Sequence, residues 1–200
     1  HRQAFLEAIS RRDGFFVPAR GRSIVRRRFL KSIESAPYPD RPLLPLMKPV
    51  HDRITVEVAR GCIRGCRFCQ AGIIYRPYRE RSQETVKDLL RGSLACTGYE
   101  ELSLASLSTG DYSDIEPLIG ALMTTYRESR VSVSLPSLRV GTLTPAMIEA
   151  IAGTRKTGFT LAPEAGTQRL RDIIQKEYRE EELLEAARQI FALGWRTLKL

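Results

Sequence analysis

From residue 50 onward, short runs of β-branched and apolar residues alternate with longer segments of helical periodicity. The runs typical of strands are residues 53–59, 101–107, 131–135, 158–162 and 196–200. Strands separated by helices of ten or more residues imply right-handed crossovers and a parallel sheet or barrel that is buried on both faces. We therefore predict an α/β fold with about five parallel strands, and we look for functional residues after their C-terminal ends.

The helices between these strands have recognisable start and stop signals. Ser82 is a good N-cap for a helix over residues 82–97, and Gly98 follows it as a stop signal. Residues 115–126 carry the most regular apolar stripe in the chain, after a cap at Asp114. A shorter helix is predicted to begin at Pro145, after a cap at Thr144.

The first 49 residues differ from this pattern, because repeated prolines interrupt them and only residues 3–12 have helical character. We interpret residues 1–49 as an arm or linker from a preceding domain, and residues 50–200 as a core domain that is incomplete at its C-terminus. The chain has neither a signal-peptide pattern nor an apolar run long enough to span a membrane. We therefore expect a cytoplasmic protein that has no membrane partner.

Positive charge is concentrated in the first part of the chain. Residues 1–81 carry a net charge of +11, whereas residues 82–200 carry −2. This asymmetry favours a polyanionic partner such as RNA, or an anionic cofactor near that end. A solvated basic face is the alternative reading.

Three of the four cysteines, Cys62, Cys66 and Cys69, lie within eight residues directly after the first predicted strand. A disulfide is a poor explanation, since the group is odd in number and the expected compartment is reducing. Structural zinc requires four ligands, and His51 lies at the opposite end of the strand. Cys96 falls inside a predicted helix, where we expect it to be a small core residue.

A [4Fe-4S] cluster needs no fourth protein ligand at this site. Three thiolates can hold three irons and leave the fourth iron open to a ligand that is not protein. Gly61 and Gly65 would let the backbone approach such a cluster closely. Arg60, Arg64 and Arg67 would lie near its negative charge and favour its reduced form.

The spacing C-x3-C-x2-C, with the aromatic Phe68 before the last cysteine, resembles the signature of the radical S-adenosylmethionine (SAM) superfamily. Five segments, the first of which contains this cysteine motif, resemble in order and spacing a subfamily that carries a cobalamin-binding-like domain ahead of the barrel. They are "VHDRITVEVARGCIRGCRFCQAGIIYRPYRERS", "SLSTGDYS", "SLPSLRV", "GFTLAPEAGTQRLR" and "GWRTLKL". The resemblance implies a truncated, partial (β/α)6-type radical SAM barrel whose upstream domain, with any bound cobalamin, lies outside this chain.

The resemblance also implies a set of cofactor contacts. Cys62, Cys66 and Cys69 would bind the [4Fe-4S] cluster, and the cluster would cleave SAM to methionine and a 5′-deoxyadenosyl radical. An electron donor of the flavodoxin or ferredoxin type is implied as a partner. Phe68 would lie beside the cofactors.

Further SAM contacts are expected on the loops after the second, third and fourth strands. The candidates are Ser108, Thr109, Gly110, Asp111, Ser134, Ser137, Glu164 and Arg169. Each has a plainer interpretation. Ser-Thr-Gly-Asp is common in turns, and Arg169 could form an ion pair with Asp172 or Glu164 on the surface.

The segment "YRPYRERS" (residues 75–82) interleaves arginines with tyrosines, a composition suited to stacking bases and touching phosphates. Alternatively, it orders the cysteine loop through Glu80 and Glu57. Three functions remain open: methyl or methylthio transfer to RNA or a ribosomal component, a cobalamin-assisted reaction on a small molecule, and a non-catalytic zinc or RNA-binding module. Because His1 and His51 are the only histidines, a histidine-centred hydrolase is disfavoured.

Overall fold

The computed structural model describes residues 1–21, 24–136, 138–152 and 158–200. It divides into two compact units, His1–Lys31 and Ser32–Leu200, which we describe separately. The first unit contains helix α1 (Arg2–Ser10) and the short 3-10 helix η1 (Pro18–Arg20). Glu7 accepts ion pairs from Arg11 at 3.0 Å and Arg20 at 3.2 Å, which joins the two helices.

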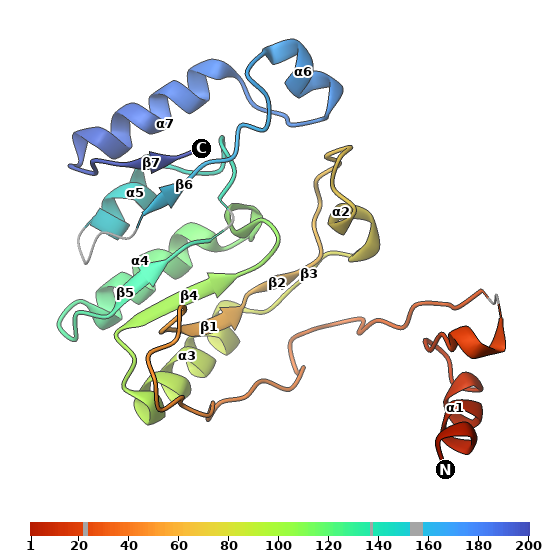
Figure 1. The fold of residues 1–200 in the computed structure, drawn as a ribbon. Coiled ribbons are helices and arrows are strands. Elements are labelled where there is room, and N and C mark those ends of the chain that lie inside the picture. Colours follow the sequence, from red (N-terminus) through yellow and green to blue (C-terminus); the bar gives the residue numbers. More distant parts are fainter. Residues whose placement is uncertain (22–23, 137, 153–157) are drawn as a thin grey trace. The chain divides into compact units, whose positions relative to one another are not determined.

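The second unit is built on parallel strands, as the alternating pattern predicted. Strands β1 (Ile54–Glu57), β4 (Glu101–Ala105) and β5 (Ser132–Ser134) form one parallel sheet in the order β1-β4-β5 (Figure 1). Strands β6 (Phe159–Thr160) and β7 (Leu198–Lys199) form a second parallel pair. The five predicted strands are therefore confirmed, and within the described residues they form a partial barrel that is not closed.

Two shorter strands lie next to this sheet. Strands β2 (Ala59–Arg60) and β3 (Arg79–Glu80) pair in an antiparallel ladder. This ladder closes the base of the loop that carries the three cysteines, since β2 enters the loop and β3 follows it. The single strand predicted over residues 53–59 is thus divided into β1 and β2.

Helices connect the strands (Figure 1). They are α2 (Ala71–Ile74), α3 (Gln83–Thr97), η2 (Thr109–Asp111), α4 (Ile115–Tyr126), α5 (Pro145–Ala152), α6 (Gln168–Ile173) and α7 (Glu180–Ala192). The Ser82 hydroxyl accepts a bond from Thr85 N, and Gly98 ends α3 at φ 70°. Met147 N donates to the predicted cap Thr144. Asp114 stands at the start of α4 but makes no side-chain cap bond, so that expectation was wrong.

The two faces of the sheet differ in chemistry because side chains alternate along each strand. The register aligns Ile54 with Leu102 and Val56 with Leu104, and these four side chains are buried in the core that α3 and α4 share. The intervening positions carry small or polar residues instead: Thr55, Glu57, Ser103, Ala105, Ser132 and Ser134. Thr55 is exposed, so the predicted burial of both faces is only partial.

Part of the predicted arm packs on this core although it forms no helix or strand. Ile33 is fully buried, and the Tyr38 hydroxyl donates to the main-chain oxygen of Thr55 at 3.0 Å. The Glu34 carboxylate accepts bonds from the main-chain nitrogen and hydroxyl of Ser82 at 2.7 and 2.6 Å. Glu34 thereby supports the first turn of α3 from a distant part of the chain.

Cys96 is exposed, which corrects its predicted place in the core. Its sulfur lies 3.3 Å from the main-chain oxygen of Asp40, on the side of α3 that faces this irregular segment. The helical pattern located Cys96 on α3 but did not show which neighbouring segment it meets. No helix within the described ranges combines the length and the apolar composition needed to cross a membrane.

Candidate functional site

The cysteine loop begins at the C-terminal end of β2, and a glycine fixes its path. Gly61 has φ +99°, a left-handed conformation that favours glycine. A Cβ atom there would lie 2.6 Å from the main-chain oxygen of Tyr75 and 2.9 Å from that of Pro77. The loop therefore packs against the main chain of residues 75–77, an approach that only glycine permits. Gly65 contributes a second close approach, with a hypothetical Cβ 3.3 Å from the Gln175 side chain.

The three thiols of this loop are free and partly exposed. Two of them have nitrogen groups close to sulfur: Arg64 N lies 3.4 Å from Cys62 Sγ, and Arg139 Nη1 lies 3.5 Å from Cys66 Sγ. Cys69 N donates to the Cys66 carbonyl at 3.0 Å, which forms a turn between these two cysteines. N–H groups aimed at sulfur are the usual surroundings of thiolates that bind an iron-sulfur cluster.

The donor set fits a cluster better than it fits a structural metal ion. Within the described part of the chain, no group of three Cys, His, Asp or Glu side chains is already gathered around a common point. A closed zinc site would need four ligands, and among the residues that the structure describes no such set is gathered. Binding of a metal centre commonly orders the loop that carries its ligands. Three unpaired thiols on one short loop are therefore compatible with a cluster whose binding brings the three sulfur atoms together.

An ion pair anchors the cysteine loop to the loop after β4. Arg64 Nε lies 2.9 Å from Asp111 Oδ2, and Arg64 Nη2 makes a second, short contact to Asp111 Oδ1. The Asp111 side chain is only 4% exposed, against 30% for Arg64. Burial by itself raises the pKa of Asp111, but hydrogen bonds from Arg64 and Ser108 outweigh it and hold the pKa below its ordinary value. Asp111, a predicted SAM contact, is thus engaged in holding the cysteine loop.

The other predicted residues after β4 have distinct environments. Ser108 is buried and bonds to Asp111. Thr109 is fully buried, and its hydroxyl donates to the Pro136 carbonyl at 2.8 Å. At Gly110, a Cβ atom would collide with the Thr142 side chain at 2.1 Å. The side chains of Ser108 and Thr109 therefore hold this loop together.

Lys176, which the sequence pattern did not indicate, lies near both Glu164 and Phe68. Lys176 Nζ is 3.2 Å from Glu164 Oε1 and 6.0 Å from the centre of the Phe68 ring. Glu164 has φ +66°, which is uncommon for a residue with a side chain. Lys176 thus links the loop after β6, which carries Glu164, to the cysteine loop, which carries Phe68.

The remaining predicted contacts are less closely associated with the cysteine loop. Ser134 ends β5 on the polar face of the sheet and is half-buried. Arg169 is exposed on α6, and over the ranges that the structure describes it makes no ion pair with Asp172 or Glu164. Ser137 lies outside the described residues.

Arg139 is a site residue that the sequence analysis missed. It follows β5, is 6% exposed, and directs its guanidinium to Cys66 Sγ and, at 3.2 Å, to the Glu177 carbonyl. Its only signal in the sequence was a single charge after the strand, inside the segment "SLPSLRV" that carried the family resemblance. A permanently charged side chain is costly to bury unless it has polar partners. The Cys66 sulfur is one of the two partners of the buried Arg139 guanidinium, which makes Arg139 part of the cysteine site.

The segment over residues 75–82 has a structural role for most of its charges. Arg81 is buried and donates to the carbonyls of Glu34 at 3.0 Å and Glu57 at 3.2 Å. Arg79 is buried as well, and Tyr78 donates to the Glu80 carboxylate at 2.6 Å. Of the two interpretations of this segment, ordering of the cysteine loop through Glu80 and Glu57 is the one that these contacts show. The reading of Arg79 and Arg81 as phosphate contacts was wrong, because both are enclosed by protein.

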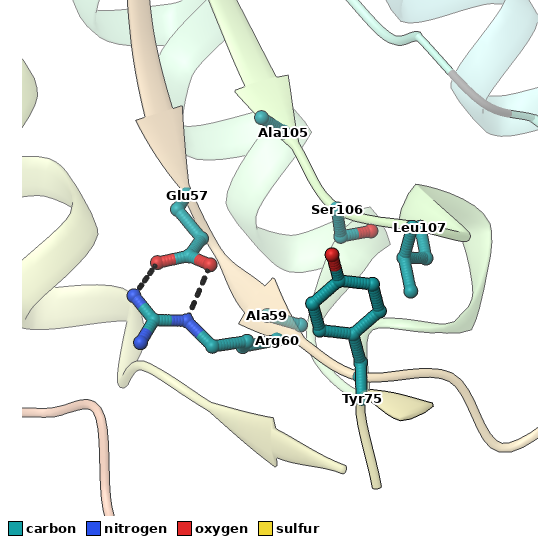
Figure 2. A pocket seen from close by; sticks show the side chains of 8 residues that line it. Glu57, Ala59, Arg60, Tyr75, Ala105, Ser106 and Leu107 are labelled. Atoms are coloured by element: carbon teal, nitrogen blue, oxygen red, sulfur yellow. Dashed lines mark hydrogen bonds and ion pairs between the residues drawn. The ribbon is translucent and has the colours of Figure 1, made fainter. Parts of the chain in front are cut away.

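A pocket of about 310 Å³ opens at the C-terminal ends of β1 and β4, beside Gly61 (Figure 2). Its lining combines small apolar groups with an ion pair, a tyrosine ring and a hydroxyl: Glu57, Ala59, Arg60, Gly61, Tyr75, Ala105, Ser106 and Leu107. Glu57 and Arg60 share two hydrogen bonds, at 2.8 and 2.6 Å. The Glu57 hydrogen bonds, followed by its charge, raise the pKa of Arg60, whereas burial opposes that shift. Arg60 therefore faces a carboxylate, although we expected it near the cluster.

The model of the radical SAM superfamily matches residues 56–200. An uncharacterized protein of Methanocaldococcus jannaschii is 33% identical over 145 residues, which is 72% of this chain and 31% of that protein. The tRNA-2-methylthio-N(6)-dimethylallyladenosine synthase of Staphylococcus epidermidis is 28% identical over 158 residues, covering 74% and 30% of the two chains. The chain thus spans less than a third of the length of these relatives.

Two solved structures share the fold. The radical SAM methyltransferase TsrM from Kitasatospora setae matches with a TM-score of 0.60 and 13% identity, over 72% of this chain and 29% of TsrM. The cobalamin-dependent radical SAM enzyme OxsB matches with a TM-score of 0.58 and 19% identity, over 74% and 23%. TsrM has been solved with cobalamin and a [4Fe-4S] cluster bound. The family of enzymes that these matches represent binds a [4Fe-4S] cluster and SAM. With its family model matched over most of its length, and with the cysteine loop at the end of the first strand, this chain belongs to the radical SAM superfamily.

Proposed function

We propose that the domain over residues 50–200 binds a [4Fe-4S] cluster through Cys62, Cys66 and Cys69 and cleaves SAM reductively. Held by these three thiols, a cluster would pass one electron from a flavodoxin- or ferredoxin-type donor to the sulfonium of SAM, and breaking of the S–C5′ bond would give methionine and a 5′-deoxyadenosyl radical. The observation that carries this proposal is the presence of three free thiols on one loop that follows the first strand of the parallel sheet.

The surrounding residues have roles that follow from their contacts. Arg64 holds the cysteine loop against Asp111, so the loop cannot swing away from the end of β4. The Arg64 main-chain nitrogen and the Arg139 guanidinium offset the negative charge of the thiolates. We propose that Lys176, which contacts Glu164 and lies near the Phe68 ring, would pair with the carboxylate of SAM, because a lysine binds anions as a point charge.

For the overall reaction, we propose methyl or methylthio transfer to RNA or a ribosomal component. This is supported by the relatives named as tRNA methylthio-modifying enzymes and by the net charge of +11 over residues 1–81. A cobalamin-assisted reaction on a small molecule is the second candidate. The fold likeness to TsrM and OxsB favours it, as does the subfamily resemblance, which implies a cobalamin-binding domain upstream.

Anaerobic reconstitution of the full-length protein with iron and sulfide tests the first step. We expect the broad brown absorbance of a [4Fe-4S] cluster and, after addition of SAM and dithionite, release of 5′-deoxyadenosine. Cys66→Ala should abolish cluster assembly and leave the helical circular dichroism unchanged, because the loop lies outside the core. Cys96→Ala is the matched control, since this exposed thiol is on α3, away from the loop.

Three outcomes would contradict this assignment. Stoichiometric zinc with no brown absorbance would make the protein a non-catalytic module. A cluster that never yields 5′-deoxyadenosine would remove the reaction. Unfolding of Cys66→Ala would give the cysteine a structural role instead. Salt-dependent binding of tRNA or rRNA then separates the RNA substrate from a small-molecule substrate.

A further inference from the structure

The pocket beside Gly61 has the composition of a site for a flat, polar ring. Ala59, Ala105 and Leu107 supply apolar walls, and the Tyr75 ring extends toward Ser106 in Figure 2. Ligand sites are generally apolar with a few fixed polar groups that set orientation. A volume of about 310 Å³ accommodates one heterocyclic ring with part of an attached sugar, and is small for an extended peptide.

The polar wall of the pocket, formed by Arg60 and Glu57, offers a donor and an acceptor side by side. A guanidinium has five N–H groups, and Arg60 uses two of them on Glu57; a carboxylate has about four lone-pair positions, and Glu57 uses two of them on Arg60. Their side chains are 38% and 33% exposed, so the remaining groups can reach a ligand. Because the two residues brace one another, they present this paired pattern in one orientation. Nucleobases carry the matching pattern of adjacent acceptors and donors along their edges.

The tyrosine supplies a stacking surface on a fixed backbone. Tyr75 is 48% exposed. Its main chain is held by its own nitrogen bonding to Ala71 O at 3.1 Å and by Arg79 Nη2 donating to its carbonyl at 3.2 Å. Gly61 packs against that same carbonyl. The ring is thus presented by an ordered segment that is continuous with the cysteine loop, and stacking on such a ring is tolerant of base identity.

We propose that this pocket receives one unstacked nucleobase of a single-stranded RNA substrate, stacked on Tyr75 and read by Arg60 and Glu57. This inference rests on the proposed function, because it places the base beside the loop at which SAM would be cleaved. Residues 32–81, in the same compact unit as the pocket, hold nine Lys/Arg against five Asp/Glu, and this net charge of +4 favours a polyanion over a free heterocycle. An indole ring has one polar group, a donor, and would leave the Arg60 donors without partners.

The test uses the full-length protein and a fluorescent ten-nucleotide single-stranded RNA, with binding measured in the absence of SAM across a salt series. Tyr75→Leu should weaken binding by about 5- to 150-fold, the usual effect of losing one stacked base. The slope of log K against log salt should stay constant, because no phosphate contact is removed. Tyr75→Phe should retain binding, since the ring remains. Phe191→Leu is the matched control, because Phe191 is also 48% exposed but lies on α7.

Arg60→Gln provides an independent readout, because it changes the polar wall and leaves the ring. It should reduce the difference in affinity between RNAs that differ in one base, while Arg60→Lys should restore only part of that difference. Circular dichroism of each variant confirms folding.

Three results would overturn the pocket assignment. Equal RNA binding by wild type, Tyr75→Leu and Arg60→Gln would remove the base from this pocket. Weaker SAM binding by Tyr75→Leu, with RNA binding unchanged, would make the pocket part of the SAM site. A loss as large in Phe191→Leu as in Tyr75→Leu would show a general effect of losing surface aromatics. Failure of the proposed function is recognised separately, as a wild-type protein that binds RNA but forms no cluster.

Discussion

Replacing Arg64 with methionine removes the partner of a carboxylate that is almost completely buried. Breaking a fully buried ion pair from one side costs about 3–5 kcal/mol, because the remaining charge stays desolvated. Asp111 is 4% exposed and so approaches that limit, whereas Arg64 is 30% exposed and its half of the pair is partly screened by water. We therefore expect Arg64→Met to lower the free energy of unfolding by about 2–4 kcal/mol.

The reverse substitution should cost less. Asp111→Asn leaves the Arg64 guanidinium, which can reach water and lies 3.7 Å from Glu177 Oε2. A loss of about 1–2 kcal/mol is expected. Because both variants break one interaction, the double variant should lose less than the sum of the two single losses, with a coupling energy of about 1–2 kcal/mol.

Urea unfolding at neutral pH measures these differences. Trp195 is the single tryptophan; it is 7% exposed and packs edge-on against Phe159 with ring centres 5.0 Å apart. Its fluorescence therefore reports loss of the core. Purely additive losses in the double variant, or a loss below about 0.5 kcal/mol for Arg64→Met, would show that the pair does not hold the loop as the structure indicates.

The pH dependence follows from the lowered pKa of Asp111. A carboxyl group whose pKa is lower in the folded than in the unfolded protein stabilises the fold above its unfolded pKa, and this stability is lost as the pH falls through the folded pKa. Without Arg64, burial raises the pKa of Asp111, so the advantage of wild type over Arg64→Met should be complete at neutral pH and should already shrink above the ordinary Asp value of 3.8 as the pH falls. An advantage that is constant down to that pH would contradict the assigned role of Arg64.

Three further predictions concern single positions. Gly61→Ala should prevent ordering of the cysteine loop, because its Cβ would lie 2.6 Å from a carbonyl oxygen. Iron incorporation should therefore fall at least severalfold. Iron analysis after reconstitution checks this, and a normal iron content would refute it. Arg139→Gln should make the reduction potential of the reconstituted cluster more negative by roughly 59 mV, which is a tenfold change for one electron. Arg139→Lys should shift the potential less, because the positive charge remains. A spectroscopically monitored redox titration measures both shifts, and an unchanged potential would exclude a role for Arg139 in tuning the cluster. Ser82→Ala should destabilise the fold by about 1 kcal/mol in urea unfolding, through loss of the cap of α3 and of a Glu34 contact, and no change would show that the cap is dispensable.

Elements with a short-range signal were predicted well. Ser82 and Gly98 delimit α3 because capping groups and left-handed glycines act within one turn of the helix end. The parallel strands followed from the alternation of strand-like and helical runs, which requires crossover connections. Cys62, Cys66 and Cys69 were located on a loop at a strand end for the same reason, and their spacing pointed to a cluster.

Contacts between distant parts of the chain were not predictable in this way. Arg64 and Asp111 are 47 residues apart, and Arg139 and Cys66 are 73 residues apart. Nothing in the local pattern distinguishes these arginines from Arg81, which is buried against main-chain carbonyls, or from the surface charges. The sequence therefore could not show which arginine meets a carboxylate, which meets a thiol and which is buried against main-chain carbonyls, whereas the structure shows each of these partners.

The sequence by itself determined the chain's class: an α/β fold with three thiols on its first strand-to-helix loop, because strand and helix periodicity and ligand spacing are properties of neighbouring residues. Only the tertiary structure decided which arginines are structural, which one reaches a thiol, and that Glu57, Arg60 and Tyr75 line a common pocket. The physical reason is that the crossovers and the strand register bring the ends of the strands together, and the partners of a charged side chain depend on that assembly rather than on its neighbours in sequence.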